Sequence, residues 1–170
     1  MAHIYTIAAA ATPFLLNRCM IGIFNGAGSG KVIKIYRITA LNNQTVAVTG
    51  VNAILKIQKI STGSGGLYLT PTKHDSQSPA VPSQIVCATN MSYTPAALIR
   101  NWSNDEPLQT TAGSVDEFEL IPRFQNLWEA SYKDTGVMPL VLREGQGVTL
   151  VNSTNTAVGV ADFFIEFTME

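Results

Sequence analysis

Hydrophobic and polar residues alternate with a period of two along much of residues 31–60, KVIKIYRITALNNQTVAVTGVNAILKIQKI. In the first half, Ile33 and Ile35 alternate with Lys34 and Tyr36. In the second half only Ile54 breaks the pattern, and the alternating apolar positions are Val51, Ala53, Leu55 and Ile57. This period is typical of strands that bury one face, and the polar residues between the two runs favour turns. We therefore predict two long β-strands that form a central hairpin.

Shorter runs along the rest of the chain predict further strands. Residues 3–7 alternate before four alanines and Thr12-Pro13, so we expect residues 1–12 to form an edge strand or an N-terminal arm. The apolar run at 14–24 predicts a strand that is buried on both faces or has a bulge at Gly22. The remaining predicted strands are residues 85–89, 98–102, a hairpin-like pair at 139–143 and 148–151, and 159–169, in which Phe163, Ile165 and Phe167 share one face.

Residues 122–132 have two possible structures. Apolar residues at three- and four-residue spacing, after Pro122, permit a helix. In the same stretch Trp128, Ala130 and Tyr132 alternate with polar residues, and a turn-forming Asp-Thr-Gly follows at 134–136. We favour the strand.

The chain therefore contains about ten short strands, separated by turn signals, with little or no helix. Proline-rich residues 71–83 are predicted to form an ordered surface loop, because prolines at this density block helices and central strands. A chain of 170 residues suits one domain, and neither a repeat nor a domain boundary is visible. We predict an all-β, single-domain β-sandwich over residues 1–170, of the jelly-roll type.

Charged residues make up 14% of the sequence, against about 25% in an ordinary soluble domain. A surface this poor in charge resembles the core of a protein interface, so we expect other subunits or partners to cover much of the exterior. The net charge of −1 gives no basic field for phosphates, and nucleic acid is not expected as a partner. No apolar run is long enough to span a membrane, and the first seventeen residues lack the charges of a secretory signal. Cys19 and Cys87 lie in apolar runs and are expected to be buried thiols.

No motif predicts a cofactor or a catalytic centre. The sequence GAGSGK at 26–31 differs from a phosphate-binding loop, because Asn25 replaces the first required glycine and Val32 follows the lysine. We predict a β-turn there. A metal site of the cupin type needs clustered histidines, whereas the chain has only His3 and His74. We therefore expect no metal, no cofactor and no enzymatic activity.

Four segments together resemble structural proteins of tailed-bacteriophage virions, in particular small β-sandwich decoration, or cement, proteins of the capsid. They are IYRITALNNQTVAVTGVNAILKIQKIS, LTPTKHDSQSP, PLVLREGQGVTLVN and ADFFIEFTME. The resemblance spans most of the chain and depends on strand and turn patterns. It implies a virion protein, made in the host cytoplasm, that binds the capsid exterior and clamps neighbouring major capsid subunits, commonly as a homotrimer.

We expect contacts with the major capsid protein in two segments, residues 2–12 and the loop 71–83. The candidate contact residues are His3, Ile4, Tyr5, Ile7, Pro71, His74, Pro79 and Pro82.

Two alternatives stay open. A receptor- or glycan-binding module of a tail fibre or baseplate would use Trp102 or Trp128 in an exposed groove. A β-barrel hydrolase would use the closely spaced acids Asp116, Glu117 and Glu119, for which a solvated strand edge is the commoner explanation.

Overall fold

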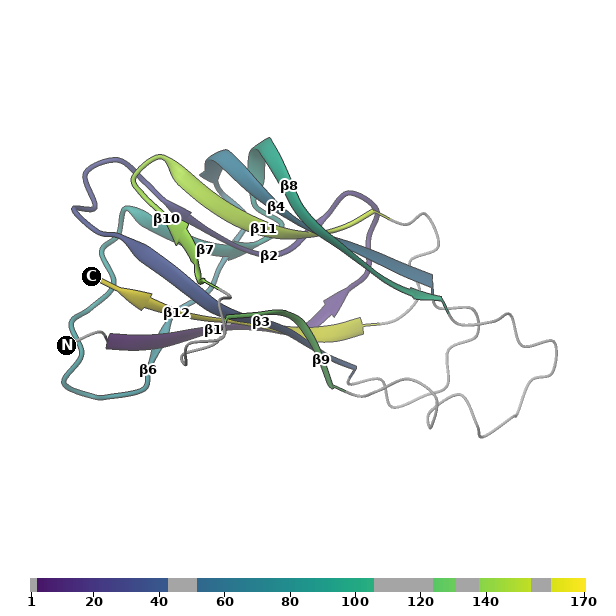
Figure 1. Cartoon of the computed structure of the whole chain (residues 1–170), viewed down its shortest axis with the longest axis horizontal. Coiled ribbons are helices and arrows are strands. Elements are labelled where there is room, and N and C mark those ends of the chain that lie inside the picture. The colour runs from purple at the N-terminus through teal and green to yellow at the C-terminus, as the bar shows by residue number, and fades with distance from the viewer. Residues whose placement is uncertain (1–2, 43–51, 106–123, 131–137, 154–159) are drawn as a thin grey trace, which may run out of the picture.

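The computed structural model describes residues 3–42, 52–105, 124–130, 138–153 and 160–170. Within these residues the chain forms twelve strands and no helix. The strands build two antiparallel sheets that pack face to face (Figure 1). The predicted all-β sandwich is therefore confirmed. The described part of the chain contains no helix long and apolar enough to cross a membrane.

Each sheet has six strands. The first, sheet A, has the order β10 (Leu140–Leu142), β3 (Ile33–Asn42), β12 (Val160–Met169), β1 (His3–Pro13) and β6 (Thr72–Lys73), with β9 (Phe124–Glu129) also paired with β3. The second, sheet B, has the order β5 (Leu67–Tyr68), β7 (Ile85–Thr89), β2 (Cys19–Asn25), β11 (Gln146–Asn152), β4 (Asn52–Ser64) and β8 (Ser92–Asp105).

The long strands alternate between the two sheets along the chain. Sheet A contains β9-β3-β12-β1 side by side, and sheet B repeats the same arrangement with β8-β4-β11-β2. Strands at the same position in the two sets follow each other in the sequence: β8 and β9, β3 and β4, β11 and β12, and β1 and β2. This winding of consecutive strands around a common core is the jelly roll, as predicted.

The predicted central hairpin is wrong. Strands β3 and β4 lie in opposite sheets: β3 pairs with β12, β10 and β9, and β4 pairs with β11 and β8. The predicted pair at 139–143 and 148–151 is wrong for the same reason, because β10 is in sheet A and β11 in sheet B. Alternation shows which face of a strand is buried. Strands in both sheets of a sandwich bury one face, so alternation cannot show whether two strands lie in the same sheet.

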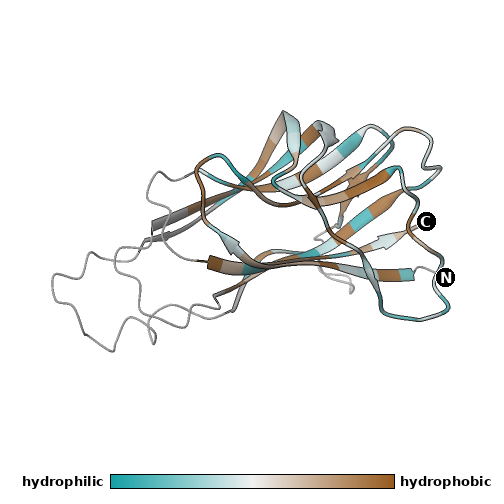
Figure 2. Cartoon of the chain, turned by 180° about the vertical axis from the view of Figure 1, so that it is seen from behind, coloured by the Kyte–Doolittle hydropathy of each residue, from teal (hydrophilic) through white to brown (hydrophobic). Residues whose placement is uncertain are grey.

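The core lies between the sheets, and it includes residues that the alternation predicted. Ile33, Ile35 and Ile57 are fully buried, and so are Phe163, Ile165 and Phe167 of β12. Hydrophobic residues are distributed along the strands of both sheets in Figure 2. Most of the buried ones form one large cluster, and Cys19, Ile60, Ala88 and Met91 form a second, small one. Residues 124–129 form a strand, which confirms the choice of strand over helix for that part of the ambiguous segment.

Strand β1 is a full member of sheet A and not a free arm. It pairs with β12 from His3 to Pro13, and its other edge pairs with β6 at Tyr5 and Thr6 only. The predicted strand at 14–24 is confirmed for β2, which is almost entirely buried. The irregularity in its register lies next to Met20 and not at Gly22, where an added Cβ would lie 2.6 Å from Met91 Cε.

Phe167→Ala should lower the free energy of unfolding by about 3–5 kcal/mol, because it removes a fully buried ring from the core. Phe164→Ala, on the outer face of the same strand, should cost about 1 kcal/mol or less. Urea denaturation measures both. Equal losses in the two variants would contradict the assignment of faces.

Candidate partner interface

The structure brings the two predicted contact segments together. Strand β6 places the start of the loop 71–83 beside β1, with Tyr5 opposite Lys73 and Thr6 opposite Thr72. The pairing continues at His74, whose N–H donates to the carbonyl oxygen of Ile4 at 3.1 Å. Segments about seventy residues apart therefore form one continuous surface, which we call the β1–β6 surface (residues 3–6 and 71–82).

Side chains fasten the loop to the strand. Tyr5 Oη donates to the carbonyl oxygen of Pro79 at 3.0 Å, His3 Nδ1 and Ser78 Oγ are 3.1 Å apart, and Thr6 Oγ1 and His74 Nε2 are 2.7 Å apart. Within the loop, Asp75 accepts hydrogen bonds from the N–H groups of Gln77 and Ser78. These bonds order the loop, as predicted.

Six of the eight predicted contact residues have exposed or partly exposed side chains on this surface: His3, Ile4, Pro71, His74, Pro79 and Pro82. The other two, Tyr5 and Ile7, are 0% exposed. The Tyr5 ring stacks on Phe167 with centroids 5.3 Å apart, and burial raises the pKa of its hydroxyl. These two side chains belong to the sandwich core and cannot contact a partner in this fold. Contact by the other six stays a prediction.

The glycine-rich turn at 26–31 holds a carboxylate of the same chain. Glu144 Oε1 accepts the N–H of Gly30 at 2.6 Å, and Gly28 and Gly30 have positive φ values of 79° and 63°. Hydrogen bonds from Gly30, Gly28 and Ser29 lower the pKa of Glu144. Consecutive N–H groups in such a turn form a site for an anion, and here Glu144 occupies it.

The cysteines are buried and free, as predicted. Cys19 Sγ accepts a hydrogen bond from Thr149 Oγ1 at 2.8 Å, and burial raises its pKa. Burial raises the pKa of Cys87 to about 12. Both thiols therefore behave as core side chains.

Of the residues predicted for the glycan-binding and hydrolase alternatives, the structure describes only the side chain of Trp128. Trp128 is partly buried and packs against the main core, and the Trp102 side chain lies outside the described residues, as do Asp116, Glu117 and Glu119. Among the residues that the structure describes, no group of three His, Cys, Asp or Glu side chains could hold a metal ion.

Several exposed apolar side chains were not predicted from the sequence. Leu67 and Tyr68 of β5 are 70% and 67% exposed, and Leu98 of β8 is 58% exposed. Strand β8 is the end strand of sheet B, and residues 94–98 (TPAAL) are all exposed. Their apolar character was visible in the sequence, but their position at a sheet edge depends on the topology.

Tyr5→Phe should lower the free energy of unfolding by about 0.5–1.5 kcal/mol, because the Pro79 carbonyl loses its donor. Limited proteolysis within the loop 71–83 should also become faster. Tyr68→Phe, at an exposed tyrosine, is the control and should change neither quantity measurably. An unchanged cleavage rate in Tyr5→Phe would show that this bond does not hold the loop.

Glu144→Gln should lower the melting temperature at neutral pH, and the difference from the wild type should shrink in acid. The pKa of Glu144 is lowered in the folded state, so its contribution is present above its ordinary pKa of 4.5. It is lost as the pH falls through the lower, folded value. Arg143→Gln is the control, because it changes the neighbouring residue and leaves the Glu144 carboxylate in place. Any destabilisation that it causes should not shrink in acid. A Glu144→Gln effect that is constant with pH would contradict this role.

No family model, curated protein or solved structure matches this chain.

Proposed function

We propose that this protein is a capsid decoration protein of a tailed bacteriophage, which binds the outside of the head and stabilises contacts between major capsid subunits. The single observation that carries the proposal is the β1–β6 surface. Two segments expected to contact the capsid, distant in sequence, lie side by side and are joined by hydrogen bonds.

The β1–β6 surface is already ordered in the free protein, which suits a cement function. Ordering a loop on binding costs free energy, and here the loop is already ordered by bonds to β1 and within itself. Its predicted contact residues are prolines, histidines and Ile4, which bury little charge. Weak contacts of this kind become effective when several linked copies engage a repeating lattice.

Strand β8 supports the homotrimer that belongs to the same proposal. Its outer edge is unpaired within the described residues, and its exposed residues 94–98 carry no charge. An unpaired edge strand can pair with another chain, and residues 94–98 lack the charge that the exposed Arg100 places further along β8. Contact between copies through β8 would cover it and leave the β1–β6 surface free for the capsid.

Purified protein should co-sediment with expanded capsid shells of its own phage that lack it, saturating at a fixed number of copies per major capsid subunit. The double variant His74→Glu/Pro79→Arg should weaken binding by roughly tenfold or more, because both side chains lie exposed on the β1–β6 surface.

Lys56→Glu is the matched control, since it changes a charge on the outer face of sheet B between the buried Leu55 and Ile57. It should bind as the wild type does. Absence of binding at every salt concentration, or wild-type binding by the double variant, would refute the proposal.

A further inference from the structure

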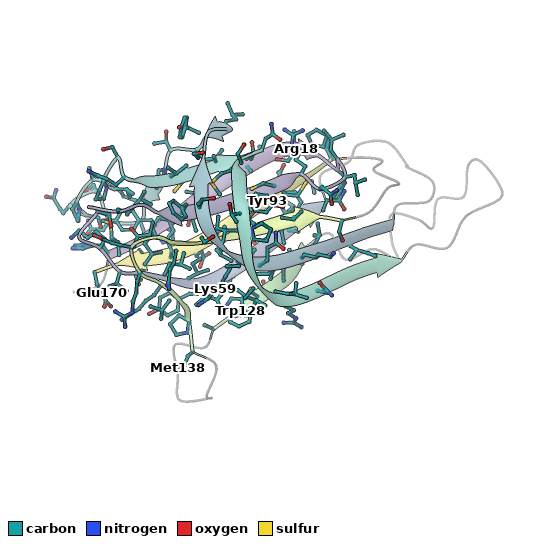
Figure 3. All side chains as sticks on the ribbon, turned by 90° about the horizontal axis from the view of Figure 1, so that it is seen from above. Arg18, Lys59, Tyr93, Trp128, Met138 and Glu170 are labelled. Carbon is teal, nitrogen blue, oxygen red and sulfur yellow. The ribbon has the colours of Figure 1, made fainter. Side chains whose placement is uncertain are left out.

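A half-open cavity of about 180 Å³ lies at one edge of the sandwich, beyond the β1–β6 surface along β1. Its walls come from both sheets. Sheet A contributes Ala9 to Pro13 at the end of β1, sheet B contributes Leu67 and Thr89, and Leu69 follows directly after β5. Arg18, in the connection from β1 to β2, completes the lining. Figure 3 shows Arg18 and Trp128 at opposite edges of the molecule, so this cavity is separate from the β9 edge.

The sequence explains why space is left here. The run of alanines at 8–11 offers only methyl groups where other parts of β1 carry large side chains. The strand also has an irregular register between Ala9 and Thr12, and Ala11 has a positive φ of 46°. Asp162 Oδ1 stabilises this shape by accepting the Ala11 N–H at 2.7 Å. The cavity therefore results from the small side chains and the irregular backbone at the end of β1.

Among the described residues, no strand pairs with the second edge of β1 beside the cavity. Strand β6 pairs only with Tyr5 and Thr6, and the His74 N–H donates to the Ile4 carbonyl. Alternate residues of a strand point their backbone groups to the same edge, so those of Ala8 and Ala10 face the side on which β6 has ended. The two alanine side chains are exposed. This edge can accept one more strand.

Arg18 supplies a cation that has no ion pair within the described residues. Its Nε is buried and has no hydrogen-bond partner there. The backbone holds it in place, because its N–H donates to the Leu15 carbonyl at 3.1 Å and its carbonyl accepts from the Asn152 N–H at 3.1 Å. A buried Nε–H without a partner is costly, and a carboxylate matches the partly exposed guanidinium in charge and shape.

We propose that this edge binds an extended peptide segment of a partner, which adds to β1 beside Ala8 and Ala10 and places a carboxylate against Arg18. The backbone pairing supplies affinity and the cavity selects the acidic side chain, as in other cases of strand addition. A small free carboxylate would use Arg18 but leave the strand edge and the apolar wall of Leu67 and Leu69 unused. The site is independent of capsid binding.

The test uses the full-length protein and dye-labelled heptapeptides of alternating valine and serine, followed by fluorescence anisotropy. The central residue is glutamate, glutamine or lysine, and a fourth peptide has the glutamate and N-methylated alternate amides. The glutamate peptide should bind, and the other three should bind roughly tenfold more weakly or worse, because each loses a charge-assisted or backbone hydrogen bond. In the complex the amides of Ala8 and Ala10 should exchange with solvent more slowly.

Arg18→Gln should remove the preference for glutamate over glutamine, and Arg18→Lys, which keeps the charge, should retain part of it. Arg100→Gln, at an exposed arginine of β8, is the matched control and should bind as the wild type does. Equal binding of the glutamate and glutamine peptides, equal binding of the N-methylated peptide, or no binding at millimolar peptide would each overturn the proposal.

Discussion

The last two strands of the chain hold both sheets together from their centres. Strand β12 lies between β3 and β1 in sheet A, and β11 lies between β4 and β2 in sheet B. Their inward side chains, among them Val148, Leu150 and Phe163, are fully buried. Each sheet therefore depends on a central strand from residues 146–152 or 160–169, and without it the strands on either side would have no common partner.

The same pairing determines what the edge of sheet A offers to other molecules. Because one edge of β1 is bonded to β12, only its second edge is available. The short β6 covers the first part of that edge and forms the β1–β6 surface, whereas the part beyond β6 stays open next to Arg18. One strand thus supports both the proposed capsid contact and the proposed peptide site. The outer face of sheet A carries ion pairs instead, such as Arg37 with Glu129 and Glu166.

The sequence predicted strand faces well and strand partners poorly. Alternation identified Ile33, Ile57 and Phe167 as core residues, since a period of two follows directly from one-sided burial. It could not distinguish a hairpin from two strands in opposite sheets. Motif spacing correctly excluded a phosphate loop at 26–31, but it could not identify Glu144 as the anion, because that contact spans 114 residues. Exposure also made Tyr5 a candidate contact, although the fold buries its ring.

Residue-resolved hydrogen exchange of the free protein tests most directly whether β1 is a locked strand that presents a preformed surface. The N–H groups of Tyr5, Ile7 and Ala9 point toward β12, so they should exchange as slowly as those of β12 itself. Exchange of these amides at the rate of an unstructured chain would mean that residues 3–9 form a free arm. That result would contradict the buried N-terminal strand and the surface built on it.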